Sequence, residues 1–71
     1  MLVKRQPVKS SVIKSAGYDP QHQELEVEFN SGDIYRYKNV SPLKATAFMA
    51  SPSKGQFFNF AIAGKHPHTK I

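Results

Sequence analysis

Two tyrosines flank an arginine in the middle of the chain, as Tyr35-Arg36-Tyr37. Because alternate residues of a β-strand point to the same side, the two rings would share one face and Arg36 would lie on the other. Aromatic rings on a strand can stack on nucleobases, and lysines beside them can contact phosphate. These three residues are therefore candidates for nucleic-acid binding, together with the lysines Lys9, Lys14, Lys38, Lys44, Lys54 and Lys65.

The turn before the tyrosines decides which face they occupy. A three-residue loop of residues 30–32, with Gly32 left-handed, pairs Val27 with Tyr35 and places both rings on the apolar face. A two-residue loop of residues 31–32 instead places both rings among the glutamates, where they would be exposed. We favour the first register because glycine stands where the loop needs a positive φ, and because aromatic residues then face β-branched ones. The tyrosines should then pack mainly beneath the helices; the alternative is that at least one ring stays accessible to a planar ligand.

Histidines and hydroxyls elsewhere give no catalytic or metal site. His66 and His68 could offer two imidazoles on one side of an extended segment, but nothing brings His22 near them, so we expect no metal and no cofactor. Ser53 lies near Gly55 without a third group to activate its hydroxyl, and helix capping explains it better. The glutamates of residues 24–28 form a solvated stripe rather than a facing pair. We therefore predict no catalytic residues and a binding protein rather than an enzyme.

Charge is segregated along the chain of 71 residues, whose net charge is +5. Residues 19–33 hold all five acids and no lysine or arginine, whereas lysine and arginine are the only fully charged residues before and after them. This pattern could place a basic face opposite an acidic one and favour a polyanion on one side. Alternatively, it could serve only to keep the surface soluble.

Length and composition indicate one small domain without disulfides. A chain this short buries only a small core, which argues against a deep substrate cavity. There is no cysteine, and no apolar stretch approaches the roughly 18 residues of a membrane span. We therefore expect a cytoplasmic protein that makes no membrane contact.

Three segments have the composition and spacing of β-strands. Residues 11–16 are rich in strand formers and end at a turn over residues 17–20. Residues 24–29 alternate strictly between glutamate and apolar residues, as a half-buried antiparallel strand requires. Residues 34–37 follow a short turn and should form the second arm of a hairpin, with Arg36 on the glutamate face in cross-strand ion pairs.

The segment after the hairpin predicts two short helices. Ser41 can cap the first, and Pro42 suits its first position because its missing N–H costs nothing there. This helix should end near residues 51–52. Apolar residues fall on one stripe of it, namely Leu43, Ala47 and Ala50.

The second helix should follow Ser53, which forms a capping-box pattern with Gln56. Phe57, Phe58, Ala61 and Ile62 recur in it with helical spacing. Gly64 is a plausible left-handed stop. The expected fold is α+β, a three-stranded antiparallel β-meander followed by two short helices packed on one face. Residues 1–9 and 65–71 lack periodicity and are predicted to be a basic N-terminal tail and a C-terminal tail around a domain of residues 10–64.

Several short segments, in this order, resemble the KTSC domain family, which includes the C-terminal domain of some lysyl-tRNA synthetases and small stand-alone proteins. The resemblance covers residues 10–64. The segments that carry it are Ser10-Ser11-Val12-Ile13, Gly17-Tyr18-Asp19, the alternating Leu25, Val27 and Phe29 before Gly32, Tyr35-Arg36-Tyr37, Val40, and the stretch from Ala50 to Asn59.

The resemblance implies a direction for function rather than a mechanism. The central Y-x-Y of the family falls on Tyr35 and Tyr37. Its turn of small residues before paired aromatic residues falls on Ser53, Gly55, Phe57, Phe58 and Asn59. The function of the family is largely unassigned, and its occurrence in synthetases suggests RNA binding.

The sequence thus predicts a small binding module. The favoured ligand is RNA, either tRNA or single-stranded RNA, held by basic residues and strand tyrosines. The alternative is an adaptor that binds a protein partner, or another copy of itself, through the aromatic helix or a sheet edge. We expect a monomer or a weak homodimer.

Overall fold

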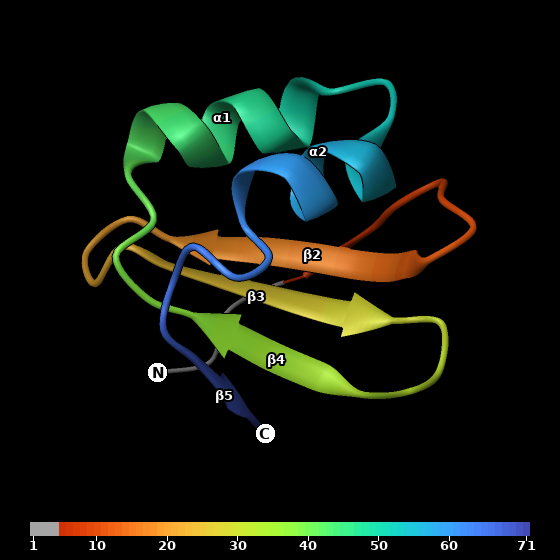
Figure 1. Ribbon diagram of the computed structural model, residues 1–71, viewed down its shortest axis with the longest axis horizontal. Coiled ribbons are helices and arrows are strands. Elements are labelled where there is room, and N and C mark those ends of the chain that lie inside the picture. The colour runs from red at the N-terminus through yellow and green to blue at the C-terminus, as the bar shows by residue number, and fades with distance from the viewer. Residues whose placement is uncertain (1–4) are drawn as a thin grey trace.

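A computed structural model describes residues 5–71 of the chain (Figure 1). The fold is a five-stranded antiparallel sheet in the order β1-β2-β3-β4-β5, with helices α1 and α2 on one face. The elements are β1 Gln6–Pro7, β2 Ile13–Asp19, β3 Glu24–Phe29, β4 Ile34–Tyr37, α1 Pro42–Ala50, α2 Lys54–Ala61 and β5 His68–Lys70. The predicted α+β class and both helices are confirmed.

The β3–β4 hairpin adopts the favoured register. Val27 pairs with Tyr35 and Leu25 with Tyr37. Gly32 has a φ of 98°, and the N–H of Phe29 donates to the carbonyl of Asp33 at 2.9 Å, which closes the three-residue loop. The glycine conformation therefore determines that both tyrosines lie on the same side as the helices.

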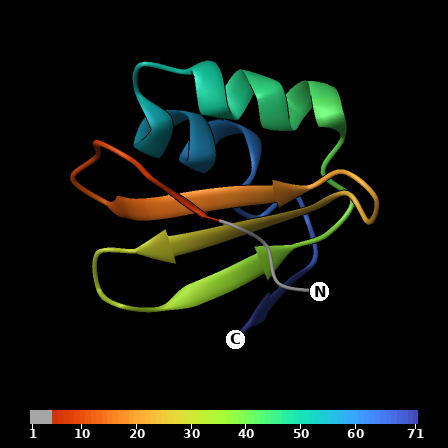
Figure 2. The ribbon, with the colours of Figure 1, turned by 180° about the vertical axis from the view of Figure 1, so that it is seen from behind.

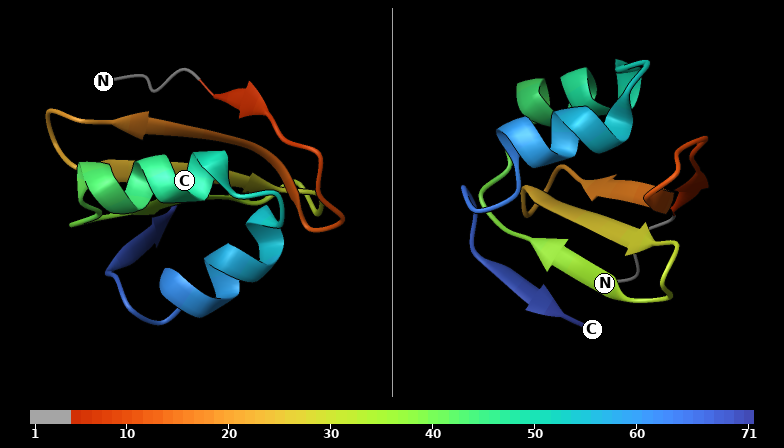
Figure 3. Two further views of the ribbon diagram at one scale, coloured as in Figure 1. Left: turned by 90° about the horizontal axis from the view of Figure 1, so that it is seen from above. Right: turned by 45° about the vertical axis from the view of Figure 1, so that its right-hand side comes forward.

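The sheet has five strands rather than the three predicted. Both additional strands are edge strands in segments that the sequence assigned to tails: β1 pairs with β2, and β5 pairs with β4 after the two helices (Figure 3). Strands of two and three residues are too short to carry a periodic pattern. The backbone of the neighbouring strand supplies their hydrogen bonds, and this information is not local.

Strand β2 runs longer than predicted, because it continues through residues 17–19 to Asp19. The turn begins only after Asp19, whose carboxylate accepts the backbone N–H of Gln21 at 3.0 Å. Near its start, Ile13 faces Phe29 while Ser15 faces Glu28, so Lys14 is the extra residue of a β-bulge. The bulge lets Ile13 and Ala16 both enter the core even though they are three residues apart.

Helix α1 begins as predicted but turns a different side to the sheet. Ser41 caps it, since its hydroxyl accepts the N–H of Lys44 at 3.2 Å. Its buried residues are Ala45 and Phe48. The stripe identified in the sequence faces solvent instead, and Leu43 is 82% exposed. The side that faces the sheet carries Phe48, Ala45 and the half-buried Met49, more apolar surface than Leu43 with two alanines, which explains the orientation.

Helix α2 lacks the predicted capping box. The side chain of Ser53 makes no cap hydrogen bond, and its backbone has a φ of −124° and a ψ of 73°, unlike the extended Ser41. The N–H of Ser53 instead donates to the hydroxyl of Ser51 at 3.1 Å. Gly64 has a φ of 74°, so the predicted left-handed residue after the helix is confirmed.

The core lies between the sheet and the two helices. Phe58 and Ile62, both among the residues with helical spacing, are buried in it, as is Phe48 of α1. The fully buried side chains of largest volume are Phe48, Ile13, Leu25, Ile62, Val27 and Val40. No helix in the described chain is long and apolar enough to cross a membrane.

Candidate nucleic-acid interface

The two strand tyrosines differ in accessibility, although they lie on the same face of the sheet. Tyr37 is only 6% exposed and packs edge-on against Phe58, with ring centroids 5.2 Å apart. Tyr35 is half-buried and lies nearly parallel to Tyr37, with centroids 6.3 Å apart. Phe29 contacts Tyr35 edge-on at 5.8 Å. Tyr37 is therefore a core residue, whereas part of Tyr35 can meet a ligand.

The burial of Tyr37 also changes the pKa of its phenol. Burial raises the pKa of its phenol above 10.0, and the nearby Tyr35 raises it further. A phenolate at this position would lose water contacts and would face a second phenol. Tyr37 is therefore neutral at physiological pH and acts as packing for the ring of Tyr35.

A groove beside Tyr35, here called the aromatic groove, opens at the end of the β3–β4 hairpin. Its apolar side is formed by Val12, Phe29, Tyr35 and Tyr37. Its polar side is formed by the hydroxyl, amide and carboxylate groups of Ser11, Asn30, Ser31 and Asp33. The groove has a volume of ≈ 590 Å³, within the roughly 300–1,000 Å³ of small-molecule sites.

Two of the candidate lysines stabilise helix ends. The ammonium of Lys44 donates to the carbonyl of Ala61 at 3.1 Å, at the end of α2. The ammonium of Lys54 donates to the carbonyl of Ser51 at 2.9 Å, just after α1. A positive charge near a helix C-terminus interacts favourably with the helix dipole. Both lysines therefore have an intramolecular role, and both remain half-buried at the surface.

His66 joins the end of α2 to the end of β4. Its Nε2 lies 2.9 Å from the ammonium of Lys44, and its Nδ1 lies 3.1 Å from the carbonyl of Lys38. If the ammonium of Lys44 donates to Nε2, then Nδ1 is the ring nitrogen that donates to the carbonyl of Lys38. The sequence contains no local signal for this link, because the partners are 22 and 28 residues apart.

A second groove, here called the lysine groove, lies where the loop before β2 meets the start of α2. Figures 1 and 2 show this loop rising from the sheet toward α2. Lys9 and Lys54 line the groove from its two sides. The remaining lining residues are Ser10, Ser11, Pro52, Ser53, Gly55 and Gln56, and none of them is acidic.

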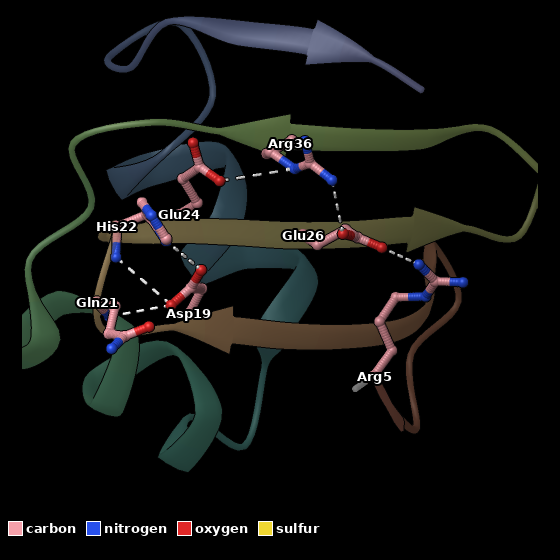
Figure 4. A network of polar contacts seen from close by, with 7 residues as sticks. All are labelled: Arg5, Asp19, Gln21, His22, Glu24, Glu26 and Arg36. Carbon is pink, nitrogen blue, oxygen red and sulfur yellow. Dashed lines mark hydrogen bonds and ion pairs between the residues drawn. The ribbon is translucent and has the colours of Figure 1, made fainter. Parts of the chain in front are cut away.

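The side of the sheet that faces away from the helices, here called the polar face, holds Arg36 (Figure 4). The guanidinium of Arg36 lies 3.5 Å from Glu26 and 3.7 Å from Glu24. The predicted cross-strand ion pairs of Arg36 are therefore confirmed. Its Nε is buried without a hydrogen-bond partner, so the pairing with Glu24 is loose.

Arg5 lies on the polar face with Arg36, and the sequence did not predict its contacts. Its guanidinium donates to Glu26 and to the hydroxyl of Ser15, and that hydroxyl donates to Glu28 at 2.9 Å. Glu26 is only 4% exposed and lies between the two arginines. Burying a carboxylate requires such compensation. The sequence held one signal for this pairing: residues 1–18 carry lysine and arginine but no acid, and the glutamates of residues 24–28 follow them.

The acids of the chain are largely neutralised within the fold. Four of the five contact a basic side chain: Asp19 with His22, Glu24 and Glu26 with arginines, and Asp33 with Lys70. Among residues 5–71, the other lysines take part in no ion pair; they are Lys9, Lys14, Lys38, Lys44, Lys54 and Lys65.

These lysines gather mainly at the two ends of α2. Lys9 and Lys54 lie at its start. Beyond its end, the ammonium of Lys44 and the backbone carbonyl of Lys38 contact His66, and Lys65 precedes His66 in sequence. Lys14 is separate, because it lines a hollow with Arg5 and Glu28 on the polar face.

The outer side of α2 is polar with one aromatic ring. Gln56 and Asn59 are exposed, and Phe60 is 82% exposed. Asn59 therefore faces solvent. Phe57 is half-buried against Phe48, with centroids 6.0 Å apart.

Comparison with known proteins agrees with this geometry. The model of the KTSC domain family matches residues 9–66. This chain belongs to the KTSC domain family. The crystal structure of a KTSC domain protein from Yersinia pestis has a TM-score of 0.95 and 43% identity to it, over 99% of both chains.

Other KTSC relatives include both small and large proteins. An uncharacterised protein of Stutzerimonas stutzeri is 44% identical over 90% of each chain. A lysine–tRNA ligase of Nostoc punctiforme is 44% identical over 80% of this chain, and the match spans 10% of the ligase. A KTSC domain therefore occurs in small proteins and within tRNA ligases.

Proposed function

We propose that this KTSC domain is an RNA-binding module rather than an enzyme, and that lysines at both ends of α2 contact the phosphates. The observation that carries the proposal is that these lysines have no carboxylate partner within the described chain, whereas the acids are largely paired. Cations without an anionic partner attract a polyanion.

The spacing of the two lysine clusters suits a single strand of RNA. Helix α2 has eight residues, so it is about 12 Å long. The clusters at its two ends can therefore contact phosphates of different nucleotides. Between them, Gln56, Asn59 and Phe60 offer two amides and one ring to unpaired bases.

The relatives support the same ligand class. Proteins named lysine–tRNA ligase in Nostoc punctiforme and in a second Nostoc strain contain a matching segment. An enzyme that handles tRNA gains affinity from an appended RNA-binding domain, and a small protein with the same domain can use it alone.

The test is a titration of the protein with tRNA and with single-stranded RNA at salt concentrations from about 50 to 200 mM. We expect binding that weakens steeply with salt. Replacing Lys9, Lys38 and Lys65 together by glutamine should weaken binding and reduce the slope of log K against log salt by about 0.7 per lost phosphate contact.

Lys14→Gln is the matched control, because Lys14 is an exposed lysine on the polar face, away from α2. It should leave the affinity for RNA nearly unchanged. Absence of binding at low salt, or binding without a salt slope, would contradict RNA binding. A loss from Lys14→Gln as large as from the α2 lysines would contradict the proposed surface.

A protein-binding adaptor is the second candidate function. Leu43 on α1 and Phe60 on α2 are each 82% exposed, and the stripe of α1 with Leu43, Ala47 and Ala50 carries no charge. Exposed apolar surface of this kind favours association with a protein.

Light scattering over a range of concentrations tests self-association. If the molecular mass rises and Leu43→Ser or Phe60→Ser abolishes the rise, the adaptor is supported; a strict monomer argues against the homodimer form.

A further inference from the structure

The aromatic groove and the lysine groove meet at Ser11, which lines both. We propose that together they bind one nucleoside phosphate, with the base in the aromatic groove and the phosphate in the lysine groove. This inference rests on the proposed RNA binding and specifies the unit that is recognised. The same chemistry is present in an unpaired nucleotide of an RNA and in a free nucleotide.

The ridge between the two grooves is held by hydrogen bonds from the hairpin tip and by others within its own loop. The N–H of Asn30, at the hairpin tip, donates to the carbonyl of Val12 at 2.8 Å, and its side-chain amide donates to the carbonyl of Ser10 at 3.2 Å. The hydroxyl of Ser10 accepts the N–H groups of Val12 and Ile13 at 3.1 and 3.2 Å. The two grooves are therefore fixed relative to each other, which lowers the entropic cost of binding a two-part ligand.

The aromatic groove suits a planar, uncharged group. Phe29 and the accessible part of Tyr35 supply ring surface, and any base can stack on an aromatic side chain because every base has a π-face. Asn30 and Asp33 at its polar side can accept from or donate to the edge of a base. No lysine or arginine of the described chain lines this groove, whereas two lysines line the other, so the phosphate is favoured there and the base here.

The lysine groove suits an anion. Lys9 and Lys54 line it, no acid does, and the hydroxyl of Ser53 makes no cap bond that would occupy it. Gly55 keeps its wall close to the ridge: a Cβ there would lie 3.3 Å from the Ser10 hydroxyl and 3.9 Å from Val12. The charges of the two grooves therefore favour the phosphate in the lysine groove and the base in the aromatic groove.

The experiment is an NMR titration of the ¹⁵N-labelled chain with each of the four ribonucleoside monophosphates. Nucleosides and ribose 5-phosphate serve as partial ligands. We expect amide shifts at Ser11, Asn30 and Gly55, with each monophosphate binding more tightly than either of its parts. Shifts confined to the polar face, or no shifts at millimolar nucleotide, would overturn the inference.

Variants separate the two parts of the site. Lys9→Gln with Lys54→Gln should weaken monophosphate binding about tenfold and nucleoside binding little, because both lysines line the groove assigned to the phosphate. Tyr35→Leu should weaken both monophosphate and nucleoside binding. Lys14→Gln should change neither, and an equal loss for Lys14→Gln would overturn the assignment.

Because Tyr35→Leu can also disturb the aromatic cluster, Ser11→Trp provides a second test from an exposed position. A bulky side chain at the junction should block the monophosphate while the melting temperature stays the same. Full binding by a folded Ser11→Trp variant would overturn a site that spans the junction.

Parallel titration with a single-stranded oligoribonucleotide separates this inference from the proposed function. If the oligonucleotide binds with a salt slope but Ser11→Trp has no effect and monophosphates give no shifts, RNA binding is supported and the nucleotide site is overturned. If monophosphates shift both grooves while no RNA binds, the site is supported for a free nucleotide and RNA binding is overturned.

Discussion

Asp19 is a buried carboxylate at the end of β2 that organises the β2–β3 turn. It accepts the N–H of Gln21 at 3.0 Å, and its other oxygen lies 2.7 Å from Nδ1 of His22 (Figure 4). The hydrogen bond from His22 lowers the pKa of Asp19 below 3.8; burial opposes this effect, and the backbone N–H groups of Gln21 and His22 add to it. The carboxylate is thus held in its ionised form by the turn that it stabilises.

This arrangement predicts a pH dependence of stability. Because the pKa of Asp19 is lower in the folded chain than in the unfolded one, its contribution is present above pH 3.8 and is lost as the pH falls through the lowered pKa. Asp19→Asn should therefore lower the melting temperature at neutral pH and reduce its fall below pH 3.8. Circular dichroism melts of both proteins between about pH 7 and pH 2 measure this.

His22→Ala is the companion variant, because it removes the largest cause of the pKa shift and leaves the carboxylate. His22→Ala should lower the melting temperature at neutral pH by less than Asp19→Asn does. If Asp19→Asn and the unmodified chain lose stability identically with falling pH, Asp19 is not the group responsible.

The candidate site residues also show how far the sequence could predict function at this scale. Strand alternation predicted that Tyr35 and Arg36 lie on opposite faces, and the pairing partners of β3 bear this out. Which tyrosine remains accessible depends on Phe58 of α2, which covers Tyr37. That contact joins residues 21 positions apart and leaves no local pattern, so the sequence could not supply it.

The two helices begin alike in sequence but not in structure. Both follow a serine, yet Ser41 is extended and caps α1 through its hydroxyl, whereas Ser53 has a different backbone conformation and caps nothing. The loop between the helices is short, and Ser51 takes the N–H of Ser53. Constraint from that loop therefore overrides the local preference of serine for a cap position.

A pair of matched variants tests this difference at the scale of the element. Ser41→Ala should lower the free energy of unfolding by about 1 kcal/mol, because it removes a satisfied cap. Ser53→Ala should change it by less than about 0.5 kcal/mol, as is usual for a surface substitution. Urea unfolding of both variants provides the measurement, and equal losses would show that Ser53 caps α2 in solution.

Across the whole molecule, the C-terminal segment completes the sheet after the chain has passed over it in two helices. Strand β5 pairs with β4, the N–H of Lys38 donates to the carbonyl of Pro67 at 2.8 Å, and Lys70 lies 3.2 Å from Asp33. Its side chains are all exposed, so backbone pairing, the Lys70–Asp33 ion pair and the contact of His68 with the rings of Tyr35 and Tyr37 attach it rather than burial. Such a strand belongs to the least stable part of a fold.

Truncation after Pro67 should therefore leave a folded domain that is less stable by about 1–3 kcal/mol, since a few backbone hydrogen bonds contribute about 0.5–1.5 kcal/mol each. Thr69→Ala, which keeps the backbone pairing, should change stability by less than about 0.5 kcal/mol. Thermal melts of the two variants make the comparison. Complete unfolding of the truncated chain would mean that β5 is required for folding rather than attached to its edge.

Local patterns were sufficient wherever short-range chemistry decides the structure. Strict alternation defined β3, glycine at the position that needs a positive φ selected the hairpin register, and serine followed by proline marked the start of α1. The order of these segments also pointed to the KTSC family. Long-range contacts decided the rest. Strands β1 and β5 form along β2 and β4, Phe48 decides which side of α1 is buried, and the two grooves meet at Ser11. These features depend on backbone and side chains distant in sequence, and become specified only when the chain packs.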